Sequence, residues 1–376
     1  MQKNIFKNNF NNYWRNVDKS ILAGFLLLFF LGIFFSFAST SFLAGERLNK
    51  DYYFFFSKHF IFATLSILIM FFISSIKLMI IKKLFVPSFI ILLISLILVP
   101  IIGIEVKGSK RWLDLIFFRF QPIEFIKPFF ILIIAKILSN SEIKTNKFSY
   151  FFSFLVLLLL IIFLLNQPDV GQSILLIGTW VAIVFVSGIN LIYIFSFLGI
   201  SIAFITSLLI IFPSKFGYIT KRLEVFLDPS KGDSFQSQKA LDAIKEGGLT
   251  GQGMGEGILK YSVPEAHTDY IISVISEEFG SIISILLICI FLYISFRIIK
   301  KTILEKDKFL KISLCGLSSI LIFQTFIHIG VNAGLLPTTG MTLPFLSYGG
   351  SSMIGSAILA GIVLNFTKKR FLTDEL

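Results

Sequence analysis

The sequence has little charge and almost no cysteine. Asp, Glu, Lys and Arg make up 15% of its 376 residues, hydrophobic residues make up 55%, and the mean hydropathy is +0.86. So few charges cannot cover that much apolar surface around one water-soluble core, which excludes a soluble globular protein. The two cysteines, Cys289 and Cys315, both lie in apolar stretches. They exclude a disulfide framework and are interpreted as small apolar side chains.

Long apolar runs fill most of the chain. A bilayer core takes about 20 apolar residues per helix. Ten runs approach that length, at residues 20–42, 58–76, 84–104, 121–138, 148–166, 171–187, 190–212, 269–296, 312–333 and 350–366. The sequence therefore predicts an all-α polytopic integral membrane protein of about ten transmembrane helices, with a large extracytoplasmic loop between helices 7 and 8.

The predicted division of the chain follows from these runs. A cytoplasmic N-terminal tail takes residues 1–19 and transmembrane helices 1–7 take 20–212. The large extracytoplasmic loop takes 213–268, helices 8–10 take 269–367, and a cytoplasmic C-terminal tail takes 368–376.

The distribution of basic residues sets the expected orientation. With residues 1–19 in the cytoplasm, 19 of the 34 Lys and Arg residues but only six of the 22 Asp and Glu residues fall on the cytoplasmic side. The net charge of +12 is then explained by the positive-inside rule and by contact with anionic lipids. The basic composition gives no reason to expect nucleic acid as a partner.

The large loop contains one predicted helix and a glycine-rich run. Residues 239–248 have helical apolar spacing and end at two glycines, which predicts a surface helix lying against the membrane. Residues 247–257 contain six glycines but no GK[ST], which disfavours a nucleotide P-loop. The run is either a tight turn or a loop whose backbone N–H groups approach an anion.

The stretch PEAHTDYIISVISEEFG, residues 264–280, places ionisable groups at the entrance of the eighth span. Asp269 is expected at headgroup depth, either as a functional carboxylate or as a first-turn residue stabilised by the helix dipole. Glu277 and Glu278 lie deeper and are interpreted as buried interhelix partners, with Glu278 on the helix face opposite Asp269. His267 is either an acid–base group or a structural hydrogen-bonding group, and the structural role is favoured.

A second cluster lies in residues 107–130. Pro122 and Glu124 suit the first turn of a helix that begins near Gln121. Glu124 and Lys127 have the spacing of an intrahelical ion pair. Arg111 and Arg119 precede the helix on the side poor in net positive charge, where they suggest a site for an anion such as a lipid diphosphate.

A third cluster lies in residues 334–361. Two prolines and the sequence YGGSS predict a broken region ahead of the tenth span, whose helix N-terminus opens toward the outer face. Small residues such as Gly355 and Gly361 predict close helix packing. Packing alone is an alternative to a binding role for this region.

Taken in order, these stretches resemble the SEDS family (shape, elongation, division and sporulation), the bacterial membrane proteins that polymerise peptidoglycan glycan strands. The resemblance rests on GSKRWLDL with QPIEFIK, QPDVGQS, RLEVFLDP, FQSQKALDAIKEGGLTGQGMGEG, VPEAHTDYI and LPTTGMTLPFLSYGGSS, and it covers nearly the whole chain. The chain departs from the family pattern at Ile123, usually Ser, and at Thr338, often Lys, which puts a cationic role at the second position in doubt.

The resemblance implies a substrate and a reaction. The substrate is lipid II, a disaccharide pentapeptide on undecaprenyl diphosphate, and the reaction is an inverting transfer with Asp269 as general base. Arg111, Arg119 and Lys260 are the cations available to the leaving diphosphate. The remaining predicted substrate-binding residues are Glu124, Lys127, His267, Ser347, Gly349 and Gly350. No metal ligands are predicted, and a divalent cation, Mg²⁺ or Mn²⁺, stays open as a cofactor.

The resemblance is stronger to the division branch than to the elongation branch of the family. It implies a place in the bacterial inner membrane at the division septum, and it implies a class B penicillin-binding transpeptidase and other division proteins as partners. An elongation polymerase, a lipid II flippase and a non-catalytic division scaffold are the alternatives.

Overall fold

The computed structural model describes residues 13–40, 53–106, 108–115, 118–140, 147–232 and 234–370. Parts of the two predicted tails, 1–12 and 371–376, lie outside the described residues.

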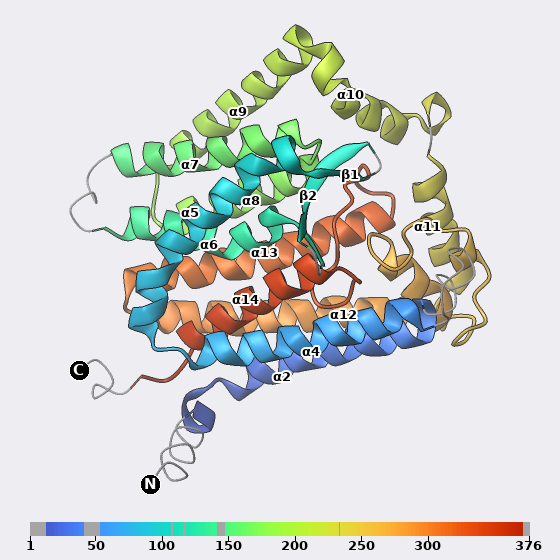
Figure 1. Ribbon diagram of the computed structural model, residues 1–376, viewed down its shortest axis with the longest axis horizontal. Helices are drawn as coiled ribbons and strands as arrows, with labels where there is room; N and C mark the ends of the chain where they lie inside the picture. The colour runs from blue at the N-terminus through green and yellow to red at the C-terminus, as the bar shows by residue number, and fades with distance from the viewer. Residues whose placement is uncertain are drawn as a thin grey trace.

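Ten helices form the body of the molecule (Figure 1). They are α2 (Lys19–Phe35), α4 (Phe54–Ser75), α5 (Leu78–Ile102), α6 (Pro122–Ser139), α7 (Lys147–Asn166), α8 (Val170–Val186), α9 (Leu191–Ile211), α12 (Ile271–Leu304), α13 (Lys308–Asn332) and α14 (Gly350–Phe366). Each overlaps one of the ten predicted spans, so the predicted fold class is confirmed. Within the described ranges, seven helices are long and apolar enough to cross a membrane, and α8 and α14 are shorter apolar helices.

Helix α14 lies in the interior, against α4 and α6. A Cβ on Gly355 would lie 2.5 Å from the carbonyl oxygen of Glu124, and one on Gly361 would lie 2.8 Å from Cβ of Ile73. The backbones approach too closely for larger residues, which confirms the packing role predicted for these glycines. This contact brings the start of α14 next to the start of α6.

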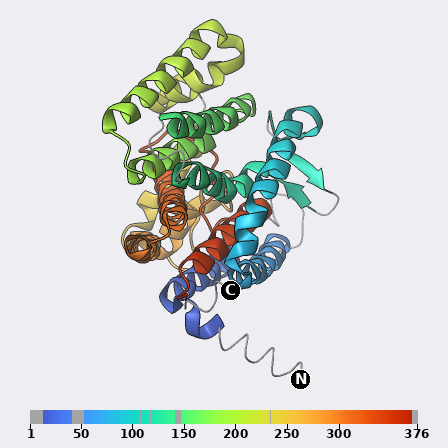
Figure 2. The ribbon, with the colours of Figure 1, turned by 90° about the vertical axis from the view of Figure 1, so that its left-hand side faces the viewer.

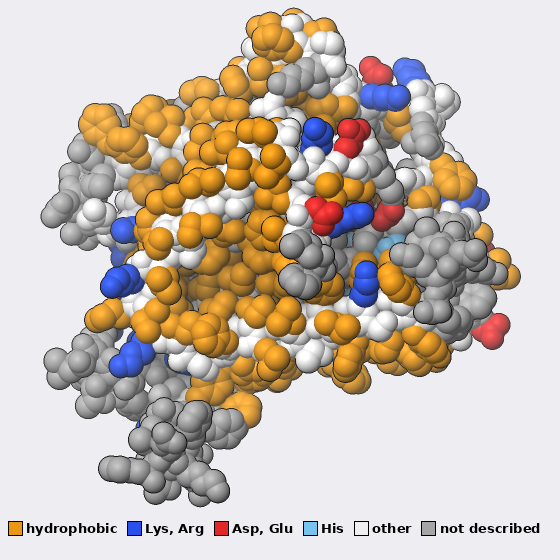
Figure 3. Space-filling model, in the orientation of Figure 1, with side chains coloured by type: hydrophobic (Ala, Val, Ile, Leu, Met, Phe, Trp, Pro, Cys, Tyr) orange, Lys and Arg blue, Asp and Glu red, His pale blue; other side chains and the backbone are white. Residues whose placement is uncertain are grey.

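The two ends of the bundle differ in charge. A broad hydrophobic surface covers the middle of the face in Figure 3, with Lys and Arg at the end where the chain termini lie and mixed charges at the opposite end. An apolar belt between two polar ends is the surface of a protein embedded in a bilayer. Figures 1 and 2 both place α9 at the edge of the bundle, and Ile194 is its one buried residue among those described.

A three-stranded antiparallel sheet lies between α5 and α6, at the mixed-charge end of the molecule. Its strands are β1 (Ile104–Val106), β2 (Ser109–Leu115) and β3 (Phe118–Phe120), in the order β1-β2-β3. Asp114 pairs with Arg119 across the second hairpin. The sequence did not predict these strands, and the sheet holds Arg111, which lies on β2, in place.

The region between α9 and α12 is mostly helical. It contains α10 (Pro213–Leu227), η3 (Pro229–Lys231), α11 (Phe235–Gly247) and η4 (Leu259–Tyr261). The helix predicted over 239–248 is confirmed as the second half of α11, which ends where Gly248 adopts a φ of 56°. Helix α10 was not predicted.

The glycine-rich run packs on α12. The N–H of Gln252 donates to the carbonyl of Glu277 at 2.9 Å, and the N–H of Gly253 donates to that of Glu278 at 3.0 Å. A Cβ on Gly251 would lie 2.2 Å from the carbonyl oxygen of Glu278. Of the two readings of this run, the tight turn fits the structure, because its N–H groups here bond to protein carbonyls.

Candidate active site

Asp269 lies just before a helix, in the turns that end the large loop. Helix α12 begins at Ile271 with Tyr270 as its N-cap, so Asp269 is not a first-turn residue. The argument that Glu278 lies on the opposite face of the same helix was wrong for this reason. Asp269 is partly buried.

Three consecutive carbonyl groups hold the backbone of this turn. The N–H of Tyr348 donates to the oxygen of His267 at 2.9 Å, and Ser347 Oγ donates to that of Thr268 at 2.6 Å. Asn332 Nδ2 donates to the oxygen of Asp269 at 3.0 Å. Two distant segments, α13 and the approach to α14, thus set the position of the Asp269 backbone.

Arg111 and Asp269 face a common point. A Cβ on Gly340 would lie 3.5 Å from Asp269 Oδ2 and 3.8 Å from Arg111 Nη1. Gly340 has a φ of 68°, in the left-handed region that favours glycine. The absence of a side chain at Gly340 therefore leaves space next to both the carboxylate and the guanidinium.

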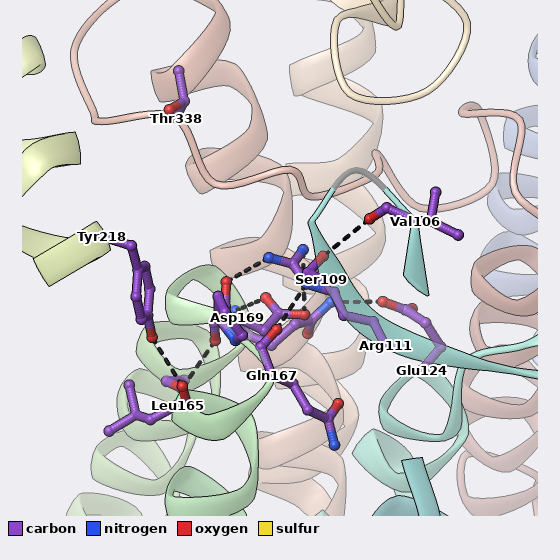
Figure 4. A network of polar contacts seen from close by, with 12 residues as sticks. Val106, Ser109, Arg111, Glu124, Leu165, Gln167, Asp169, Tyr218 and Thr338 are labelled. Atoms are coloured by element: carbon purple, nitrogen blue, oxygen red, sulfur yellow. Dashed lines mark hydrogen bonds and ion pairs between the residues drawn. The ribbon is translucent and has the colours of Figure 1, made fainter. Parts of the chain in front are cut away.

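Arg111 is anchored from behind (Figure 4). Its Nε donates to the carbonyl of Gln167 at 3.0 Å, its Nη2 donates to the carbonyl of Pro168, and its Nη1 lies 3.8 Å from Asp169 Oδ2. Side chains from β2 and from the turn between α7 and α8 thus form one unit. The planar guanidinium donates to two neighbouring carbonyl groups of this turn at once, a geometry that a lysine ammonium cannot reproduce.

Asp169 caps α8 by accepting the N–H of Gln172 at 3.3 Å. Burial raises the pKa of Asp169, while the positive charges of Arg111 and Arg222 act in the opposite direction. Arg222 lies on α10 and its Nη1 donates to the carbonyl of Thr338 at 3.4 Å. Two cations therefore lie near one buried acid.

Neither Asp169 nor Arg222 was singled out from the sequence. Both belong to stretches that carry the family resemblance, QPDVGQS and RLEVFLDP, and that membership was the available signal. Tyr218 is a further missed member of the cluster. Its hydroxyl donates to the carbonyl of Leu165 at 3.0 Å, and burial raises its pKa to about 12.

The Glu124–Lys127 ion pair is buried below the Arg111 region. Lys127 Nζ lies 2.7 Å from Glu124 Oε2 and donates to Gln324 Oε1 at 3.0 Å, and Gln172 Nε2 donates to Glu124 Oε1 at 2.6 Å. The intrahelical pair predicted from the spacing is thus present, and it also links α6 to α8 and α13. Burial and full pairing give it a structural role.

Some polar atoms in this part of the bundle are buried without a hydrogen-bond partner. In the described residues they include Thr339 Oγ1, Gln172 Oε1 and His328 Nε2. Thr339 neighbours Gly340 in the chain, and Gln172 is bonded to Glu124. Buried polar groups normally have partners, so these are the atoms at which ordered water would bind.

The other predicted residues take different places. Arg119 is exposed on β3. The His267 ring packs between Phe55 and Tyr348, with ring centroids 4.9 and 5.7 Å away, which fits the favoured structural role. Ser347 Oγ accepts the N–H of Leu343 at 2.8 Å.

The two glycines that follow also belong to the framework. A Cβ on Gly350 would lie 2.7 Å from the Phe62 ring, and Gly349 is the N-cap of α14. Ser347 thus holds the turn that carries Asp269, and Gly349 and Gly350 form the tightly packed start of α14.

Lys260 has a different role from the one predicted. Its side chain is 2% exposed, and its Nζ forms an ion pair with Glu278 and donates to the carbonyl of Gly255 at 3.1 Å. Glu277 accepts the N–H groups of Leu259 at 2.6 Å and Lys260 at 2.7 Å. A lysine enclosed in this way is not exposed to a diphosphate. The two glutamates are buried, as predicted, but their partners are in the large loop.

The fold and the site together define a multi-pass membrane protein with a preorganised carboxylate and arginine cluster at one end of its helical bundle. Within the described ranges, no three His, Cys, Asp or Glu side chains gather as a metal-binding group.

Comparison with known proteins identifies the family. The family model FTSW_RODA_SPOVE, described as "Cell cycle protein", matches residues 18–371. The chain is 34% identical to the probable peptidoglycan glycosyltransferase FtsW of Caulobacter vibrioides over 95% of this chain and 91% of that protein. It is 32% identical to the stage V sporulation protein E of Bacillus subtilis over 91% and 94%. The chain therefore belongs to the FtsW/RodA/SpoVE family, and the SEDS resemblance is confirmed.

Solved structures share the fold. A chain of a peptidoglycan synthase complex that coordinates polymerization and crosslinking matches with a TM-score of 0.77 at 24% identity, over 93% of this chain and 97% of that one. The rod shape determining protein RodA of Thermus thermophilus matches with a TM-score of 0.66 at 23% identity, over 93% and 96%. Fold and family together make the chain a multi-pass inner membrane protein.

Proposed function

We propose that this chain is a peptidoglycan glycosyltransferase that polymerises lipid II into β-1,4-linked glycan strands during septal wall synthesis. Family membership and the names of its relatives support the activity. The observation that carries the assignment is that Asp269 Oδ2 and Arg111 Nη1 both lie within 4 Å of the position that a Cβ on Gly340 would take. A proton acceptor and a cation then lie at one site, as a transfer from a diphosphate requires.

In the proposed reaction, Asp269 takes the proton from the 4-hydroxyl of the acceptor GlcNAc. The oxygen of that hydroxyl attacks the anomeric carbon of the donor sugar, and the bond from that carbon to the diphosphate oxygen breaks. The leaving undecaprenyl diphosphate keeps the electron pair. One displacement converts an α-linked donor into a β-linked product. The turn that holds Asp269 keeps the carboxylate in place for this step.

Arg111 provides positive charge for the leaving group, and Arg119 lies on the next strand. Lys260 is omitted from this set because it is enclosed by Glu278. A divalent cation, Mg²⁺ or Mn²⁺, would be held mainly by the diphosphate oxygens. Such an ion would add positive charge at the leaving group.

The expected orientation places α10, α11 and the sheet on the outer side of the cytoplasmic membrane. It places both termini in the cytoplasm. Both sugars are then tethered by lipids at the depth of Asp269. The expected partner is a class B penicillin-binding transpeptidase at the division septum. Its support is the fold match to a chain of a peptidoglycan synthase complex.

The test is polymerisation of labelled lipid II by purified protein, with and without the transpeptidase. Asp269→Asn keeps the size of the side chain but removes its basicity, and the rate should fall by about 10²- to 10⁴-fold. Asp242→Asn is the matched control, because Asp242 is exposed on α11.

Three outcomes would contradict the proposal. Near-normal polymerisation by folded Asp269→Asn would refute the mechanism. A wild-type protein that moves lipid II between leaflets without polymerising it would identify a flippase. A wild-type protein that does neither, but binds the transpeptidase, would identify a scaffold.

A further inference from the structure

A large groove opens beside the candidate active site. It encloses about 1150 Å³, including space open to solvent, between α10, α11 and residues 334–338. Its lining includes Lys221, Arg222, Gln238, Phe226 and Pro337. Cationic, amide and apolar side chains in one groove suit a ligand with an anionic group, sugar or peptide groups and an apolar part.

Arg222 connects this groove to the active site. Its guanidinium lines the groove and donates to the carbonyl of Thr338, two residues from Gly340. In Figure 4, Thr338 and Tyr218 lie around the same region as Arg111 and Asp169. The groove therefore opens next to the point that Asp269 and Arg111 face.

Arg222 has few hydrogen-bond partners for a half-buried cation. Burial lowers the pKa of Arg222, the positive charge of Arg111 lowers it further, and the negative charge of Asp169 acts in the opposite direction. Among the described residues, the single hydrogen bond of Arg222 is long, at 3.4 Å, although a guanidinium has five N–H donors.

We propose that Arg222 binds the diphosphate of the lipid-linked donor together with Arg111, and that the groove holds the sugar and peptide part of that donor. The inference rests on the proposed function and adds a second cation and a headgroup site to it. A diphosphate has two charged phosphate groups, and each can accept paired hydrogen bonds from one guanidinium group. A monophosphate can accept such paired bonds from only one guanidinium group well.

The test measures the binding of two product-like probes to the full chain in nanodiscs that contain phosphatidylglycerol, so that ordinary anionic headgroups compete throughout. The probes are undecaprenyl diphosphate and undecaprenyl monophosphate. Wild type should prefer the diphosphate. Arg222→Gln should weaken diphosphate binding about tenfold and leave monophosphate binding almost unchanged. Arg222→Lys should bind the diphosphate more tightly than Arg222→Gln but less tightly than wild type, because lysine keeps the positive charge but lacks the paired N–H donors of the guanidinium.

Lys239→Gln is the matched control. Lys239 lies on α11, where its Nζ is 5.8 Å from the Phe235 ring centroid, and it is not among the residues lining the groove. It should leave both affinities unchanged. An unchanged preference in Arg222→Gln, or equal loss for both probes, would overturn the inference. The proposed function would fail separately, if wild-type protein bound the diphosphate but did not polymerise lipid II.

Discussion

Replacing Lys260 decides whether its ammonium is a structural group or a substrate ligand. Lys260 is enclosed, with Nζ paired to Glu278 and bonded to Gly255. Lys260→Met removes the positive charge and leaves the Glu278 carboxylate buried without its cation. The double variant Lys260→Met with Glu278→Gln removes both charges and retains an oxygen that can accept the N–H of Gly255, now 3.3 Å from Glu278 Oε1.

The expected magnitude follows from burial. The side chains of Lys260 and Glu278 are 2% and 0% exposed. Removing one partner of a buried pair costs about 3–5 kcal/mol, whereas replacing both by neutral groups is often close to neutral. The single variant should therefore be much less stable than the double variant. The loss should concentrate where residues 247–261 pack on α12.

Hydrogen exchange followed by mass spectrometry measures this local stability. The amides of Leu259 and Lys260, which bond to Glu277, are the reporters. In Lys260→Met their exchange should accelerate roughly 10²- to 10³-fold, since each 1.4 kcal/mol is a factor of ten. The double variant should regain most of the protection and most of the lipid II polymerisation. A double variant that is protected but inactive would refute the structural role and restore Lys260 as a substrate ligand.

The remaining predictions concern the site, the charges and the orientation. Gly340→Ala places a methyl group 3.5 Å from Asp269 Oδ2, and polymerisation should fall at least tenfold; Gly188→Ala, at a φ of 90° with no atom within 4 Å, should not reduce it. Arg111→Lys should also lose at least tenfold activity, because lysine cannot fork between Gln167 and Pro168, whereas Lys301→Ala should retain it. Burial alone would raise the pKa of Asp18, but the N–H of Ile21 and the charges of Lys301 and Arg297 hold it below the usual 3.8. The negative charge of Asp18 stabilises the fold above pH 3.8, and this contribution is lost as the pH falls through the lower pKa that Asp18 has in the folded protein. The thermal midpoints of wild type and Asp18→Asn should therefore converge as the pH falls below 3.8. A cysteine reagent confined to the outside should label Lys231→Cys and not Lys306→Cys, and the reverse would overturn the orientation.

The helical bundle could be predicted because membrane spans obey a local rule. Apolar runs of bilayer length must form helices that satisfy their own backbone groups. The interior glycines of α14 were also readable, since small residues at helical spacing permit close packing. Both signals lie within about 20 neighbouring residues, where no knowledge of distant contacts is needed.

The sheet and α10 were missed because their stabilising contacts are distant or mixed. Strands β1 and β3 have only three residues each, too few for a recognisable alternation. Helix α10 carries Lys221, Arg222 and Glu224 among apolar residues, so it lacked the apolar continuity that identified the spans. Its Tyr218 and Arg222 contact the α7–α8 turn and residue 338, which no local pattern reveals.

In the candidate site too, local features could be predicted from the sequence and distant contacts could not. The sequence placed Asp269 at the end of a span, but it also assigned Asp269 to the helix, whereas the structure begins that helix two residues later, at Ile271. Gly340 was not a candidate at all. Its importance comes from two side chains that lie 71 residues before it and 229 residues before it in the chain, and only folding brings them together.

The roles of the three cations at this end of the bundle could not be distinguished from the sequence. Arg111, Lys260 and Arg222 all occur in polar segments at the same end of the bundle, and charge alone ranks them equally. Their acceptors separate them: Lys260 has a buried carboxylate of its own, whereas Arg111 and Arg222 share Asp169. Lys260 is enclosed with its own buried acid and has little to offer a diphosphate, whereas Arg222 lines the groove and has one long hydrogen bond among the described residues. These different surroundings point to Arg111 and Arg222 as the diphosphate ligands and to Lys260 as part of the framework.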